Sequence, residues 1–153
     1  APARSPLLDA PSLYSIGLAH KHLPEMQKLA GLDSAPVFVP ILGDIRQGMM
    51  TSVMLQNRLL NGSPTAQDIC EMLSSYYEGQ EMVRVLPFGG ETPRLATSAL
   101  AGKDYLTITV SGHTDQTLLT AQFDNLGKGA SGAAVQNMNI MLGFPESTGL
   151  NID

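Results

Sequence analysis

The chain has 153 residues, of which 43% are hydrophobic and 15% are charged. A net charge of −5, with basic residues that form no run, argues against a surface for nucleic acid or anionic membrane. A small anionic substrate remains compatible, because binding one needs only one or two local cations. The single cysteine, Cys70, excludes an internal disulfide and is typical of a reducing compartment.

The start of the chain carries no targeting signal. Its first residues, APARSPLLDAP, lack the basic and apolar regions of a signal peptide, and no later stretch has the length of a transmembrane helix. We therefore expect a soluble, cytoplasmic protein. Residues 1–12 contain three prolines and are expected to be a linker or a cut end, whereas residues 13–153 are predicted to form one domain.

The first predicted elements are short and interrupted by proline. Residues 13–19 favour a strand, and Pro24 suits the first turn of a helix over residues 24–29 that Gly31 ends. APVFVPIL, residues 35–42, is typical of a buried strand, although its prolines restrict it to an edge or an interrupted course.

A strand and an amphipathic helix are predicted next. GMMTSVMLQ, residues 48–56, favours a strand. Asn61-Gly62 indicates a turn, after which Ser63 is expected to cap a helix that has Pro64 at its first position. One apolar face follows from helical spacing, formed by Ala66, Ile69, Cys70, Leu73, Tyr76 and Tyr77. On such a face a thiol is more often packing than nucleophile.

The last third predicts a short strand, a loop, a hairpin and a helix. These are residues 83–86, the loop 87–104 rich in Gly and Pro, strands 105–110 and 117–123 around a GHTDQ turn, and a helix from Gly129. The order of elements predicts an α+β fold, with a mixed, largely antiparallel sheet and helices packed on one face.

AHKHLPEM, residues 19–26, holds two of the three histidines. If this segment is extended, His20 and His22 project to the same side, because side chains alternate along a strand. From the chemistry alone, a pair of surface or hydrogen-bonded histidines is the favoured explanation. A metal site would need further ligands, and only His113 and scattered carboxylates are available, so no metal is expected.

DNLGKGASGAAVQNMN, residues 124–139, presents Lys128 in a glycine-containing turn before a helix. Residues this small indicate that some group comes close to the backbone. The spacing is not that of a phosphate-binding or dinucleotide fingerprint. Close packing of the helix explains the small residues as well as a ligand does.

Three stretches together resemble N-acetyl-gamma-glutamyl-phosphate reductase of arginine biosynthesis: HKHLPEM, VPILGDIRQGMM and DNLGKGASGAAVQNMNIMLG. That family shows H-x-H-x-P-E, a strand ending in an R-G-M or similar turn, and a closing D-N-L-x-K-G-A-x-G-x-A-V-Q helix. The match runs from about Leu13 to Gly143. Related semialdehyde dehydrogenases share a looser version of the last motif.

The resemblance implies an NADP-dependent enzyme with a Rossmann domain and a second α+β domain, similar to the carboxyl-terminal domain of glyceraldehyde-3-phosphate dehydrogenase. The second domain supplies substrate contacts and the oligomer interface. In the implied reaction a cysteine thiolate attacks the acyl phosphate, phosphate leaves, and NADPH delivers hydride to the thioester to release the semialdehyde.

The resemblance also assigns roles to residues of this chain. His20 is the first candidate for the acid/base and His22 the alternative, with Glu25 as an orienting or substrate-binding partner. Arg46 is expected to grip an anionic group of the substrate, or else to be a solvated turn residue. The implied cofactor contacts are Asn125, near the nicotinamide, and Lys128.

Two features of the family are missing from this sequence. There is no G-C-Y-x-T type nucleophile motif and no glycine-rich cofactor loop. We therefore expect a carboxyl-terminal half that is inactive alone, partnered by a missing amino-terminal half that binds most of the NADP, and forming a homo-oligomer. The alternatives are a non-catalytic self-association module, or the equivalent domain of a related semialdehyde dehydrogenase.

Overall fold

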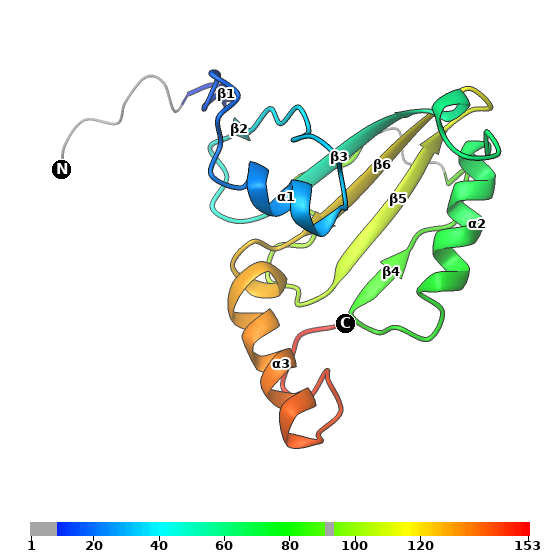
Figure 1. Ribbon diagram of the computed structural model, residues 1–153. Coiled ribbons are helices and arrows are strands. Elements are labelled where there is room, and N and C mark those ends of the chain that lie inside the picture. The colour runs from blue at the N-terminus through cyan, green and yellow to red at the C-terminus, as the bar shows by residue number, and fades with distance from the viewer. Residues whose placement is uncertain (1–8, 91–93) are drawn as a thin grey trace. The chain divides into compact units, whose positions relative to one another are not determined.

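The computed structural model describes residues 9–90 and 94–153 (Figure 1). The chain divides into two compact units, one ending at Arg46 and the other running from Gln47 to Asp153. The expected domain from residue 13 stays a prediction, and most of the expected linker lies outside the described residues. Among the described helices, none is long and apolar enough to cross a membrane.

The first unit contains a pair of very short strands and one helix. β1 (Ser12–Leu13) pairs antiparallel with β2 (Ile41–Leu42). α1 (Leu23–Leu29) has a proline in its first turn and is followed by Gly31 at a φ of 63°. A glycine in this left-handed conformation ends a helix without strain, so both helix signals in the sequence are confirmed.

The strand predicted over residues 13–19 is wrong beyond its first residue. Ser15 and Leu18 take φ values of 52° and 54°, in the left-handed region, so the chain turns where a strand would have to continue. The pattern of apolar and polar residues in this stretch did not predict these turns.

The buried strand predicted over residues 35–42 is reduced to β2, which agrees with the interrupted course that its prolines predicted but not with a full-length buried strand. Only the two residues after Pro40 pair with another strand. Proline has no N–H to donate to a ladder, and this stretch contains two prolines. The stretch is not buried either, because Val37 is 80% exposed and Ile41 is 64% exposed.

The second unit is built on one four-stranded sheet in the order β3-β6-β5-β4. β6 pairs antiparallel with both β3 and β5, whereas β4 runs parallel to β5. The predicted mixed, largely antiparallel sheet is therefore confirmed. Its strands are β3 (Met49–Gln56), β4 (Val83–Val85), β5 (Leu106–Gly112) and β6 (Gln116–Phe123).

α2 (Ala66–Tyr76) lies along one face of this sheet, against β4, β5 and β6 (Figure 1). Its buried residues Ala66, Ile69 and Cys70 pack against Val110. Cys70 is 3% exposed, and its thiol donates to the carbonyl of Leu86 at 3.5 Å, which confirms a packing role. The predicted apolar face ends early, since Tyr76 is 77% exposed.

The amino-terminal cap of α2 differs from the predicted one. Thr65, not Ser63, is the N-cap: its hydroxyl accepts the amide hydrogen of Asp68 at 3.2 Å, and the Asp68 carboxylate accepts the amide hydrogen of Thr65 at 2.8 Å. These bonds to Thr65 outweigh desolvation and lower the pKa of Asp68. Ser63 instead takes a φ of 46° within the preceding turn.

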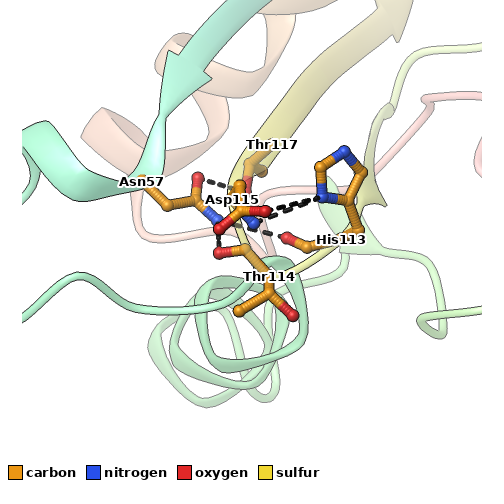
Figure 2. A network of polar contacts seen from close by, with 5 residues as sticks. All are labelled: Asn57, His113, Thr114, Asp115 and Thr117. Atoms are coloured by element: carbon orange, nitrogen blue, oxygen red, sulfur yellow. Dashed lines mark hydrogen bonds and ion pairs between the residues drawn. The ribbon is translucent and has the colours of Figure 1, made fainter.

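Buried Asn57 ties the β5–β6 hairpin to η2 (Asn57–Leu59), a short 3-10 helix after β3 (Figure 2). Its Nδ2 donates to the carbonyls of His113 and Thr114 at 3.2 and 2.9 Å. Its Oδ1 accepts the hydroxyl hydrogen of Thr117 at 2.9 Å. The Asn57 side chain, in a residue that is 1% exposed, thereby bonds to two carbonyl groups and one hydroxyl group of the hairpin.

The last helix is confirmed, but it begins with a π-helical turn. η3 (Gly127–Ser131) makes i to i+5 hydrogen bonds from Gly129 to Asp124 at 2.8 Å and from Ser131 to Leu126 at 3.1 Å. α3 (Gly132–Leu142) continues from it, leading away from the end of β6 (Figure 1). π-helical turns are rare in proteins, and those that do occur are often found at functional sites.

The cap assignment can be tested by substitution. We expect Thr65→Ala to lower the free energy of unfolding by about 1 kcal/mol, because an amide of the first turn loses its acceptor. Urea denaturation followed by circular dichroism measures this loss. Ser63→Ala is the matched control, and an equal loss in both variants would contradict the assignment.

Candidate functional site

The two histidines of residues 19–26 lie together in the first unit. His22 is the N-cap of α1, with φ and ψ of −84° and −7°. The centroids of its ring and of the His20 ring are 5.0 Å apart. The extended segment that would have turned both imidazoles to one side is not formed, and a turn brings the two rings together instead.

His20 is half-buried between aromatic rings. Its ring meets Tyr14 and Phe38 edge to face, with centroid distances of 5.6 and 5.1 Å. Its Nδ1 accepts the amide hydrogen of His22 at 3.2 Å. Because Nδ1 accepts, the proton of the neutral ring resides on Nε2. His20 therefore offers an N–H donor rather than a free lone pair.

His22 is oriented by Glu25, one helical turn further on. Its Nδ1 lies 3.3 Å from Oε2 of Glu25, and the two side chains are 51% and 64% exposed. A carboxylate at this distance favours a proton on Nδ1, which leaves the Nε2 lone pair free to accept one. This arrangement of carboxylate and imidazole is suited to a general base.

Arg46 is the last residue of the first unit and is exposed. Its guanidinium makes no hydrogen bond or ion pair with the residues that the structure describes. The sequence analysis did not predict the contacts of Tyr14 and Phe38 with the His20 ring. Phe38 lies within residues 35–42, which were predicted to form a strand.

Asn125 and Lys128 belong to the second unit, after β6. Oδ1 of Asn125 accepts the amide hydrogen of Gly48 at 2.8 Å. Gly48 has a φ of 122°, and a Cβ there would lie 2.4 Å from the carbonyl oxygen of Thr97. The glycine of the R-Q-G sequence is therefore required by close backbone packing, and Asn125 fixes this turn beside the end of β6.

Lys128 already has a partner. Its Nζ donates to Oε1 of Gln136 at 2.5 Å, and Gln136 donates in turn to Oε2 of Glu146 at 2.7 Å. Burial lowers the pKa of Lys128, an effect that the carboxylates of Glu146 and Asp104 oppose. The chain Lys128–Gln136–Glu146 braces the start of α3 against the segment that follows it, so a cofactor contact would have to replace this bond.

The small residues of the closing motif are accounted for by packing. A Cβ on Gly132 would lie 2.2 Å from Oδ1 of Asp104, and one on Gly127 would lie 2.9 Å from the same atom. The group that comes close to the backbone is therefore the Asp104 side chain. Of the two explanations left open by the sequence, the structure favours packing.

Asp124 holds the end of β6, and the sequence analysis did not single it out. Its side chain, in a residue only 1% exposed, accepts amide hydrogens from Gly102, Leu126 and Gly127 at 2.6, 2.8 and 3.2 Å. Gln47 donates to it at 2.5 Å. Burial raises the pKa of Asp124, but these four hydrogen bonds together bring it below its ordinary value.

Metal binding is not supported by the described part of the chain. Within residues 9–90 and 94–153 no three His, Cys, Asp or Glu side chains are grouped so that they could hold a metal ion. His113 accepts the amide hydrogen of Asp115 at 3.2 Å and serves the hairpin turn (Figure 2).

The fold and the motifs define a class of protein. A family model described as "Semialdehyde dehydrogenase, dimerisation domain" matches residues 4–125, and the chain belongs to this family. The aspartate semialdehyde dehydrogenase II of Vibrio cholerae has the same fold, with a TM-score of 0.57 and 22% identity, over 78% of this chain and 35% of that one.

Within this class the chain is similar to N-acetyl-gamma-glutamyl-phosphate reductases. It is 44% identical to reductase 2 of Pseudomonas putida over 96% of this chain and 47% of that protein. It is 41% identical to reductase 2 of a Nostoc species over 90% of this chain and 45% of that protein, and 47% identical to the Brucella ovis reductase over 86% and 44%. The resemblance seen in the motifs is confirmed, and the chain spans about half the length of these relatives.

Substitution of Asp124 tests its role. Its pKa lies below the ordinary value of 3.8, so its contribution to stability is complete above that pH and is lost as the pH falls through the lower, folded-state pKa. We expect Asp124→Asn to cost roughly 2 kcal/mol at neutral pH, because hydrogen bonds to a charged group are lost. The difference from the parent chain should shrink below about pH 4.

Thermal melts between pH 3 and 7 measure this difference. Asp115→Asn is the control, because the Asp115 side chain is 86% exposed. A pH-independent effect of Asp124→Asn would show that the carboxylate charge is not what matters.

Proposed function

We propose that this chain is the carboxyl-terminal half of an NADP-dependent N-acetyl-gamma-glutamyl-phosphate reductase, acting in arginine biosynthesis in the cytoplasm. In this reaction NADPH reduces a small anionic acyl phosphate to N-acetylglutamate semialdehyde, with release of phosphate. The observation that carries the proposal is the intact cluster of His20, His22 and Glu25 in a chain 41% and 44% identical to proteins of that name.

The contacts support a division of labour between the two histidines. His22 has Glu25 on Nδ1 and its Nε2 lone pair free, so we assign to it the removal of the thiol proton and later proton transfers. His20 presents Nε2–H, which is suited to hydrogen bonding with an oxyanion as the acyl group is attacked. This reverses the order of preference that the motif alone indicated.

The remaining groups of the reaction belong to the complementary half. A cysteine there would form the thioester, and a Rossmann domain there would bind most of the NADP. Cys70 is buried in the core of this chain and is not that cysteine. We propose Arg46 as a clamp for the substrate's phosphate or carboxylate, and Asn125 and Lys128 as contacts to the cofactor. The chain alone is then inactive.

A chimaera tests these roles. In it, the half of the Pseudomonas putida reductase that this chain does not match precedes residues 1–153. We expect His22→Asn to lower kcat by a factor on the order of 10² to 10⁴ with little change in the thermal melt. Glu25→Gln should lower kcat less, because the imidazole loses only its orienting partner.

His20→Asn is the matched variant on the neighbouring ring. If kcat falls in His20→Asn but not in His22→Asn, the base role belongs to His20. Wild-type kcat in both histidine variants, or turnover by the 153-residue chain alone, would refute the proposed chemistry.

A second function, self-association, is favoured by the sheet. We call the face opposite α2 the open face; it comprises Met50, Ser52, Met54, Thr109, Ser111, Leu118 and Thr120. Met54 is 83% exposed and Leu118 is 36% exposed. A second copy laid on this face would cover both side chains.

A charge introduced on the open face is expected to weaken self-association. We expect the chain to be a dimer or larger species at tens of micromolar, by order of magnitude. Met54→Asp should weaken this association at least about tenfold, because a carboxylate would be buried without a partner. Analytical ultracentrifugation measures it. Met72→Asp, on an α2 methionine that is 60% exposed, is the control, and equal dissociation by both variants would contradict the assignment.

A further inference from the structure

The Asp124 carboxylate uses its two oxygens for different parts of the second unit. Oδ1 accepts the amide hydrogens of Leu126 and Gly127 at 2.8 and 3.2 Å, which closes the turn after β6. Oδ2 accepts hydrogens from the side chain of Gln47 and from the amide of Gly102, at 2.5 and 2.6 Å. Asp124 is 1% exposed, so its role is not direct contact with a ligand. A buried carboxylate with donors on both oxygens ties these segments together.

Asn125 lies inside this turn and is held at both its backbone and its side chain. The amide that follows it, that of Leu126, is bound by Oδ1 of Asp124. The Oδ1 atom of Asn125 accepts the amide hydrogen of Gly48 at 2.8 Å. Gly48 directly follows Gln47, whose side chain is bound by Oδ2 of Asp124. Both supports of Asn125 therefore depend on the same carboxylate.

The orientation of the Asn125 amide follows from its bond to Gly48. Because a backbone N–H faces its Oδ1, Nδ2 is the donor end that remains. This Nδ2 makes no hydrogen bond with the residues that the structure describes, and Asn125 is exposed. An amide NH₂ in this position suits a carbonyl oxygen and not another donor. The carboxamide of a nicotinamide carries such an oxygen.

We propose that Asp124 is a positioning residue for Asn125, directing its Nδ2 donor toward the carboxamide oxygen of the nicotinamide in NADPH. This rests on the proposed function, because the cofactor is inferred from it. The Asp124→Asn side chain has only one oxygen, so it can keep the bonds of one segment and must lose those of the other. Asn125 would then lose one of its two supports, and ordering its side chain would add to the cost of binding.

Cofactor binding by the chimaera with the complementary half of the Pseudomonas putida reductase tests the proposal. We expect Asp124→Asn to raise the Kd of NADPH roughly three- to tenfold, which corresponds to the loss of about one hydrogen bond. In the Asn125→Ala background the same substitution should change Kd by less than about twofold, because its effect passes through the Asn125 side chain. Binding of an adenosine bisphosphate that lacks the nicotinamide should not change.

Hydrogen exchange of the Gly48 amide in the 153-residue chain is the second readout, and it needs no cofactor. We expect this amide to exchange at least about tenfold faster in Asp124→Asn than in the parent chain, relative to the amides of β5 and β6. Gln47→Met, which keeps the buried charge and removes one donor to it, should act in the same direction with a smaller loss of stability. It replaces Asp124→Asn if that variant does not fold.

Asp68→Asn is the matched control, because it removes a carboxylate that caps α2 and has no bond to the turn after β6. It should leave the exchange of Gly48 and the Kd of NADPH unchanged. Unchanged exchange of Gly48 in both Asp124→Asn and Gln47→Met would overturn the proposal.

The binding data separate positioning from a general loss of structure. Equal weakening of NADPH and of the adenosine bisphosphate would overturn the proposal, and so would an equal effect of Asp124→Asn with and without the Asn125 side chain. Faster exchange of Gly48, in a case where the parent chimaera binds no NADPH, would support the positioning of Asn125 while rejecting the proposed function.

Discussion

The buried carboxylate of Asp124 is the contact on which the second unit depends. It lies at the end of β6 and accepts hydrogen bonds from Gln47, before β3, and from Gly102, in the long connection before β5. It also accepts the first amides of η3, Leu126 and Gly127. One charged group thus joins a strand end, a loop and the start of the last helix, and so much donation offsets the cost of burying it.

The same junction determines the shape of the closing motif. Gly127 and Gly132 leave room for Asp104, whose carboxylate accepts the amide hydrogen of Asn151 at 2.9 Å. The glycines, the π-helical turn and the last residues of the chain therefore form one packed structure around two aspartates. The space beside the small residues of this motif is therefore filled by the protein's own side chains.

The histidine cluster is held by contacts between residues that are close in sequence. Its members are close in sequence, so a single turn before α1 is enough to bring His20, His22 and Glu25 together. Few residues are buried in this unit, and Leu23 is the buried residue of α1. Local contacts therefore position these three side chains.

The sequence by itself determined the elements with strong local signals and the family. The alternation in β5, the apolar face of α2 and the glycine after α1 depend on neighbouring residues, and so do the motifs that identify the class. Prediction from the sequence failed where local signals conflicted. Pro36 and Pro40 outweighed an apolar run. Thr65 with Asp68 made a better helix cap than Ser63.

Only the tertiary structure decided which groups the motif residues meet. Gln47 and Asp124 are 77 residues apart, as are Gly48 and Asn125, and Arg84 reaches the carbonyl of Ile152 across 68 residues. No spacing rule connects such pairs, because their contact depends on strand order and on how the connections fold back. For that reason Asn125 was recognised as a residue of a motif, whereas its actual partner, Gly48, became known only from the folded chain.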